Sequence, residues 1–225
     1  MNSTLGDQML SILSAATGTL QLVFWSLVIS TIIGALLTPV AVRKNIWVRL
    51  PIMVYSWIGR ALPPLTLLIG FYFGFIYAGI RLPGMTAAII AFVFLNAAYT
   101  VEIFRAGYLA VPKGQFEGVK ALGLPPWRAQ LGIIAPQVLR VSTPALITNA
   151  TTVLKDSALA SVIGVMEMTA QTQRIVQSAP GHAIILYSYL AVLYIVLCSG
   201  LFILQHYLEK RLKVHRRPQA LRRKP

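Results

Sequence analysis

The sequence is poor in charge, and especially in acidic charge. Only 12% of its 225 residues are charged, and six Asp and Glu stand against 20 Lys and Arg, whereas 56% are hydrophobic. Soluble domains carry roughly a quarter of their residues as charged side chains. A water-soluble fold is therefore excluded for most of the chain.

Signatures of catalysis and of metal binding are absent as well. No GxxxxGK[ST] segment is present to hold nucleotide phosphates. The three histidines, His182, His206 and His215, form neither an HExxH motif nor a zinc constellation, and the single cysteine, Cys198, cannot form a disulfide within one chain. We expect no enzymatic activity, no metal site and no cofactor in this chain.

The net charge of +14 does not indicate nucleic acid binding. The Lys and Arg residues lie between apolar runs and in the C-terminal tail. They are not interleaved with aromatic residues along one face, as a nucleic-acid groove requires.

Long apolar runs make up most of the sequence. About 20 apolar residues are enough to cross the hydrocarbon core of a bilayer as a helix. The sequence thus predicts an all-α, polytopic membrane protein, with one transmembrane domain over residues 1–212 and a basic tail over residues 213–225. The five predicted spans lie at about residues 18–42, 62–80, 85–104, 141–166 and 183–206.

The distribution of basic residues orients these spans. Seventeen of the 20 Lys and Arg lie in residues 43–60, 105–140 and 210–225. Because cytoplasmic loops are enriched in Lys and Arg, we expect the N-terminus outside, the C-terminus inside, and the tail against anionic membrane lipid. In Ile46–Ala61 apolar residues recur at steps of three and four. This predicts a helix in the cytoplasmic interface or, alternatively, the start of the second span.

Polar side chains interrupt the third and fourth runs. Asn96, Tyr99 and Glu102 follow one another at steps of three in the third run. An ionisable group at membrane depth costs about 2.5–3.5 kcal/mol unless it finds a partner or water. The fourth run holds so many polar residues that we expect a discontinuous helix, buried in protein or lining a cavity.

These polar residues suggest a pathway for a zwitterion, in which carboxylates meet its ammonium group and half-helix N-termini meet its carboxylate. Alternatively, Glu102 only pairs with Arg105, and Lys155 with Asp156. The predicted pathway residues are Asn96, Tyr99, Glu102, Lys155, Asp156, Ser157 and Glu167.

The segment between the third and fourth runs carries the most specific pattern. It begins at Glu117 and reads EGVKALGLPPWRAQLGIIAPQ. Residues 122–126 (LGLPP) are a helix stop followed by a break, so we expect two short helices at an angle, with Gly123 at positive φ. Such a knob can fit a groove on a cytoplasmic partner.

This segment resembles the EAA loop of bacterial ABC-importer permeases, whose pattern is Glu-Ala-Ala, three residues, Gly, nine residues, then Ile-x-Leu-Pro. Gly118, Val119 and Ala135 depart from the pattern, each by a small or apolar residue. We place an ATPase-coupling loop at about residues 109–137. Its candidate residues are Glu117, Gly123, Leu124, Ile133 and Pro136.

The flanking segments AAYTVEIFRAGYLAVPK and VSTPALITNATTVLKDSALASVIGVMEMT resemble the polar amino acid permeases of the histidine, glutamine and glutamate type. The resemblance implies a type I ABC importer permease fold in the bacterial cytoplasmic (inner) membrane. It also implies an ABC ATPase subunit in two copies, which binds ATP and Mg, and an extracytoplasmic solute-binding protein. A second permease is implied too, either the same chain or a homologous one. The alternative is a self-sufficient secondary transporter or channel, against which the lack of an inverted repeat argues.

Overall fold

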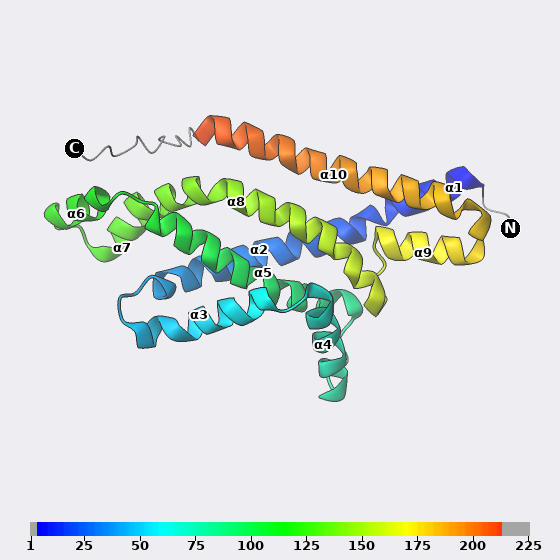
Figure 1. The fold of residues 1–225 in the computed structure, drawn as a ribbon, viewed down its shortest axis with the longest axis horizontal. Helices are drawn as coiled ribbons and strands as arrows, with labels where there is room; N and C mark the ends of the chain where they lie inside the picture. Colours follow the sequence, from blue (N-terminus) through cyan, green and yellow to red (C-terminus); the bar gives the residue numbers. More distant parts are fainter. Residues whose placement is uncertain (1–3, 213–225) are drawn as a thin grey trace, which may run out of the picture.

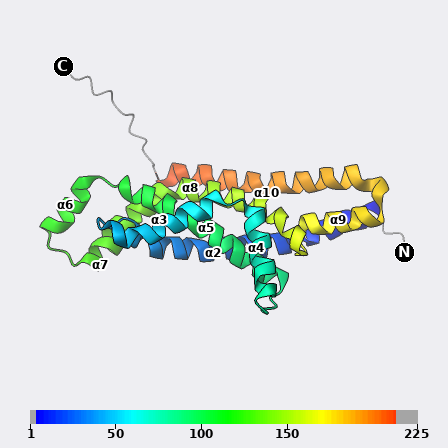
Figure 2. The ribbon, with the colours of Figure 1, turned by 60° about the horizontal axis from the view of Figure 1, so that its bottom comes forward.

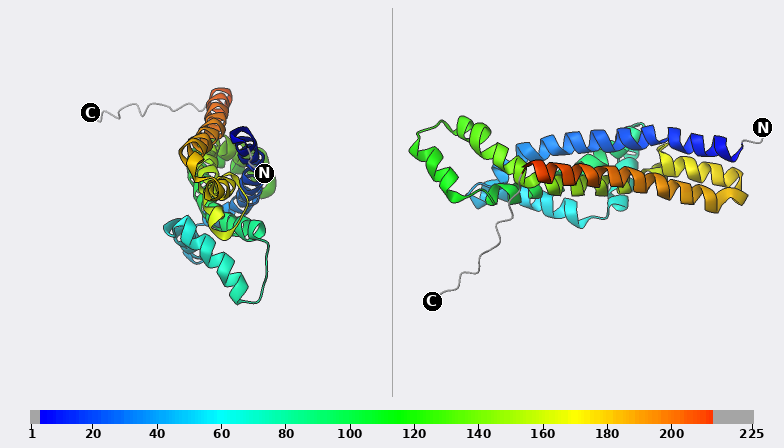
Figure 3. Two further views of the ribbon diagram at one scale, coloured as in Figure 1. Left: turned by 90° about the vertical axis from the view of Figure 1, so that its right-hand side faces the viewer. Right: turned by 90° about the horizontal axis from the view of Figure 1, so that it is seen from above.

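The computed structural model describes residues 4–212, and every regular element within them is a helix. Most of the long helices run side by side along one axis, so the protein is an elongated bundle (Figure 1). α9 and the N-terminus lie at one end and α6 and α7 at the other, as the turned views also show (Figures 2 and 3). The predicted all-α fold is confirmed, whereas the tail at 213–225 lies outside the described residues.

The helices fall into a long and a short set. The body of the protein consists of α1 (Leu5–Ser14), α2 (Ala16–Ala41), α3 (Ile46–Ala61), α4 (Pro64–Tyr77), α5 (Gly84–Leu109), α8 (Ala135–Asp156) and α10 (Ala183–Leu212). The connecting elements are α6 (Lys113–Ala121), α7 (Pro126–Ala129), a π-helical turn (Gln130–Ile134), a 3-10 helix (Ser157–Ile163), α9 (Met168–Ser178) and a second 3-10 helix (Pro180–His182).

Four stretches of the described chain are long and apolar enough to cross a membrane, and they overlap the first, third, fourth and fifth predicted spans. The last of these helices continues beyond the predicted end at residue 206, to Leu212. There Gln205 Nε2 donates to Glu209 Oε1 over 3.0 Å. A polar contact at this spacing supports a helix beyond its apolar run. The four stretches are residues 5–41, 84–109, 126–163 and 180–212.

The second predicted span is wrong in its placement. α3, expected in the interface or alternatively as the start of the second span, packs against α2 and α5 in the bundle, which supports the alternative. α4 is bent from α3 by 106° and projects sideways (Figure 3). Pro63 and Pro64 lie at the bend. They interrupt the helix there, because proline lacks an amide donor and disfavours a helical conformation in the residue before it. The bent pair α3 and α4 therefore replaces residues 62–80 as the candidate for the fifth span.

The apolar stripe of α3 faces away from the bundle. Val54 and Trp57, both on that stripe, are 44% and 68% exposed. The buried residues are Ser56 and Gly59, and Ser56 Oγ donates to the Ala98 carbonyl oxygen of α5 over 3.2 Å. Lipid is as apolar as the stripe, so in a membrane protein small and polar residues mark the face that packs against protein.

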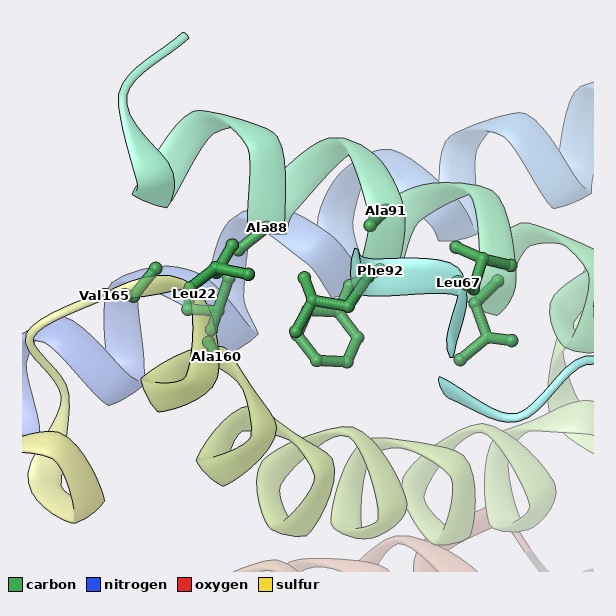
Figure 4. Close-up of a cluster of buried hydrophobic side chains, with 10 residues drawn as sticks. Leu22, Leu67, Ala88, Ala91, Phe92, Ala160 and Val165 are labelled. Atoms are coloured by element: carbon green, nitrogen blue, oxygen red, sulfur yellow. The ribbon is translucent and has the colours of Figure 1, made fainter. Parts of the chain in front are cut away.

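A buried apolar cluster ties the base of α4 to the bundle. Figure 4 shows Leu67 of α4 in one cluster with Leu22 of α2, Phe92 of α5, and Ala160 and Val165 from the segment after α8. Phe92 is 2% exposed, and Leu22 and Ala160 are completely covered. The cluster holds the bend between α3 and α4 against α5 and the end of α8.

The fourth predicted span changes its helix type after Asp156, but up to Ile163 it belongs to one candidate membrane stretch. At Asp156 α8 passes into the 3-10 helix Ser157–Ile163, and Gly164 turns the chain with a φ of +79°. Only glycine adopts this left-handed conformation without a steric penalty. The following helix, α9, packs between α1 and α10.

Candidate functional site

The segment predicted to be the coupling loop, about residues 109–137, forms a projecting knob at one end of the bundle (Figure 1). α6 ends in a Schellman motif, in which Gly123 N–H donates to the Lys120 carbonyl oxygen over 3.0 Å and Leu124 N–H to that of Val119 over 3.4 Å. Gly123 has a φ of +60°, and beyond its chain neighbours no atom lies within 4 Å of the place a Cβ would take. The expected positive φ and the two short helices α6 and α7 are confirmed.

An apolar cluster anchors the base of this knob to α5 and α8. Ile133 packs against the cluster, and Pro136 lies in the first turn of α8, where a missing N–H costs least. Gln137 Nε2 donates to Gln115 Oε1 over 3.0 Å and joins α8 to α6. The knob is therefore held at both ends. The buried members of the cluster are Phe104, Val111, Ile134 and Val138.

The tip of the knob is apolar and exposed. Leu122, Trp127 and Leu131 are 72%, 61% and 67% exposed, and Glu117 is exposed on α6. Exposed apolar groups gathered on one projecting loop are typical of a contact with another protein. The sequence analysis missed these three apolar residues, because nothing in the local pattern separates them from the buried Ile134.

A groove along α5 and α8 is the second feature, and it consists of two adjoining cavities. The first cavity has a volume of about 410 Å³ and also touches Pro64 at the bend between α3 and α4. Asn149 Nδ2 donates to Asn96 Oδ1 over 3.4 Å, which links α8 to α5. The polar residues that line this cavity are Asn96, Tyr99, Thr148, Asn149, Thr152 and Asp156.

The second cavity, of about 370 Å³, continues the groove toward the coupling loop. It shares Tyr99, Ile103 and Ala145 with the first cavity, so the two form one continuous surface. The charged residues that line it are Arg60 and Glu102.

Glu102 has two partners in this second cavity. Its Oε2 accepts from Arg105 Nη2 over 2.7 Å, and its Oε1 from Ser56 Oγ over 3.3 Å. The pairing with Arg105 that we considered as an alternative is therefore present. It does not remove Glu102 from the groove, since the same carboxylate lines the cavity.

Three of the predicted pathway residues lie off the groove. Lys155 is exposed and lines neither cavity. Ser157 and Glu167 are completely buried, and Ser157 Oγ donates to the Leu154 carbonyl oxygen of the preceding turn over 2.7 Å. The structure brings together four of the seven predicted residues, which are Asn96, Tyr99, Glu102 and Asp156.

Glu167 caps α9 instead, in the segment between the last two candidate spans. Its Oε1 accepts from the Ala170 N–H over 2.7 Å, and its Oε2 from the Thr169 N–H over 2.9 Å and from the Tyr194 hydroxyl over 3.2 Å. Burial raises the pKa of this carboxyl, and the hydrogen bonds to the two amides and to Tyr194 oppose the rise. Every hydrogen bond of this carboxylate thus serves the local fold.

Glu167→Ala is expected to destabilise the protein by about 1–2 kcal/mol, because the first amides of α9 lose their acceptors. Glu167→Gln keeps one oxygen acceptor and should cost less. The midpoint of thermal unfolding in detergent measures both variants. An alanine variant as stable as the wild-type protein would contradict the capping role.

The comparison with known proteins decides the family. The chain matches the family described as "Binding-protein-dependent transport system inner membrane component" over residues 26–214, which include both the knob and the groove. The chain belongs to this family. It is a multi-pass membrane permease and a transport component, and permeases of this fold work with ATPase and binding-protein partners.

Individual relatives agree with this assignment. The probable amino-acid ABC transporter permease protein YckA of Bacillus subtilis (strain 168) is 35% identical over 193 residues, which cover 86% of this permease and 85% of YckA. The L-cystine transport system permease protein TcyB of the same organism is 34% identical over 184 residues, 82% and 77% of the two chains.

A solved structure confirms the fold. The crystal structure of an amino acid ABC transporter with histidines superposes on this permease with a TM-score of 0.81 at 30% identity, covering 89% of this chain and 94% of that one. The expected type I importer permease fold and the resemblance to amino-acid ABC permeases are thereby confirmed.

Proposed function

We propose that this permease carries polar amino acids or amino-acid derivatives across the bacterial cytoplasmic (inner) membrane, as a subunit of an ABC importer. The observation that carries the proposal is the placement of the knob and the groove on one helix. α8 begins at the anchored base of the knob and ends at Asp156 in the groove. The names of YckA and TcyB support amino acids as the substrate class.

In this proposal a separate ATPase, present in two copies, binds ATP and Mg and supplies the energy, and this chain holds no cofactor. The exposed side chains at the tip of the knob, Leu122, Trp127 and Leu131, enter a groove on that ATPase. Glu117 lies on the same knob and contributes a charge to the contact. Closure of the ATPase is transmitted to α5 and α8 through the apolar base of the knob.

A second permease completes the pathway, either the same chain or a homologous one. Tyr99, Thr148 and Thr152 of the groove are exposed on the isolated chain. Polar side chains at membrane depth are not left facing lipid but face protein or a water-filled cavity. A facing permease converts the open groove into such a cavity, and an extracytoplasmic binding protein delivers the solute to it.

Reconstitution into liposomes tests this function. We expect uptake of radiolabelled L-glutamine, L-histidine or L-cystine. This uptake should require the ATPase, the binding protein, and ATP on the side of the membrane where the ATPase is bound. Gradient-driven uptake by the permease alone would instead establish the self-sufficient secondary transporter.

A further inference from the structure

Arg60 starts from the middle of the bundle and not from the end that carries α6 and α7, where the charge pattern of the sequence places it. α3 packs antiparallel to α5. Ser56 Oγ donates to the Ala98 carbonyl oxygen and to the Glu102 carboxylate. Three residues later in α3, a Cβ on Gly59 would lie 2.6 Å from the Ala98 side chain and 3.9 Å from the carbonyl oxygen of Phe94, which is earlier in α5. Ala98 is close to the middle of α5 (Gly84–Leu109). Arg60, next to Gly59, therefore begins about halfway along the bundle.

The terminal nitrogens of Arg60 are available to a ligand. Among the described residues its hydrogen bond is from Nε to the Ser56 carbonyl oxygen, over 3.1 Å. The nearby carboxylate of Glu102 is already bound by Arg105 through three contacts of 2.7–3.2 Å. Arg60 is exposed and lines the second cavity of the groove.

The charges at this end of the groove do not cancel. Arg60 and Arg105 supply two positive charges against the one negative charge of Glu102. The other acidic residue of the groove, Asp156, lines the first cavity and not the second. One end of the groove is therefore positive and the other negative. A cation kept at membrane depth without a carboxylate of its own is costly, and such residues mark solute pathways.

We propose that Arg60 binds the carboxylate of the amino acid during its passage, an inference that rests on the proposed function and names the group that selects this chemistry. A guanidinium presents parallel N–H donors that match the two oxygens of a carboxylate. The sequence analysis had assigned the carboxylate to half-helix N-termini, and the groove offers a side chain for it.

The test compares an amino acid with its carboxamide. The probes are radiolabelled L-glutamine and L-histidine, bound to the assembled permease and ATPase in nanodiscs and displaced by the unlabelled amino acid or by its α-carboxamide. The wild-type protein should prefer the amino acid by about tenfold or more, because the amide offers no anionic oxygens. Arg60→Gln should lose that preference, because only the binding of the amino acid is weakened. Arg60→Lys keeps the positive charge without the paired N–H donors of a guanidinium, and its preference should lie between the two.

A matched control is Arg81→Gln, which removes a cation from the turn between α4 and α5, outside the groove, and should keep the wild-type preference. An unchanged preference in Arg60→Gln, or an equal loss for amino acid and amide, overturns the proposal. Should the glutamine variant fail to assemble, Arg60→Lys decides in the same way. ATP-dependent uptake by the wild-type protein separates the two claims. If uptake is present and the Arg60→Gln variant keeps the preference, only the role of Arg60 is refuted. If uptake is absent, the proposed function is refuted as well.

Discussion

Gly123→Val should separate the permease from its ATPase and abolish ATP-dependent uptake, while the protein remains inserted and folded. Gly123 has a φ of +60°, a conformation that costs a residue with a Cβ roughly 1–2 kcal/mol, and more when the side chain is branched. The space around it is open, so the penalty comes from the backbone and falls on the shape of the knob. Co-purification of the ATPase and uptake in liposomes measure the effect.

Two further variants make this result specific. Gly118→Ala alters another glycine of the same knob, also without neighbours within 4 Å but inside α6, where alanine favours the helix. It should associate normally. Gly123→Asn should retain most of the association, because asparagine tolerates positive φ better than other residues. Normal association and uptake in Gly123→Val would mean that the knob is not the docking element.

Gly34→Leu should lower the midpoint of thermal unfolding in detergent by on the order of 5–10 °C, because overpacking of this size costs about 1–3 kcal/mol. A Cβ at Gly34 would lie 2.5 Å from Thr100 Cγ2 and 3.1 Å from the Thr100 backbone carbon. Thr100 cannot move aside easily, since its hydroxyl donates to the Asn96 carbonyl oxygen over 2.8 Å and its Cβ, which no side-chain rotation moves, lies 2.7 Å from the same position. The substitution therefore forces the two helices apart.

The matched control for this variant is Gly70→Leu on α4. Gly70 is also a helical glycine in an apolar segment, but no atom lies within 4 Å of its Cβ position. It should leave the unfolding midpoint of the isolated permease unchanged. An equal loss of stability in both variants would show that leucine is unfavourable in these helices for a reason other than the contact with Thr100.

The long helices could be predicted from the sequence because each apolar run exceeds the thickness of a bilayer. The path of residues 46–80 could not. Periodicity shows that α3 has an apolar face, but it does not tell whether that face meets lipid or protein, and here Trp57 faces outward while Ser56 and Gly59 pack. For this reason the sequence analysis placed Arg60 at the cytoplasmic surface of the membrane, whereas in the structure it lies about halfway along the bundle.

Some residues of the candidate site could likewise be predicted from the sequence, and others could not. Gly123 and the steps of three from Asn96 to Glu102 could be found from local pattern, because a helix stop and a helical face are local properties. Glu167 could not be judged, since a carboxylate in an apolar run looks the same whether it meets a solute or caps a helix. Its three hydrogen bonds become visible only when α9 and Tyr194 are in place.

The geometry of α8 has a mechanical consequence. Its 22 residues form one helix about 33 Å long, fixed to the knob at one end and carrying Asn149, Thr152 and Asp156 near the other. A tilt of about 10° at the base would displace the far end by about 6 Å, roughly the rise of four residues along the helix. In the proposed function, a small movement of the ATPase against the knob would be enlarged along α8, and it would change the width of the groove near Asp156 once the packing of α8 against α5 and α10 yields.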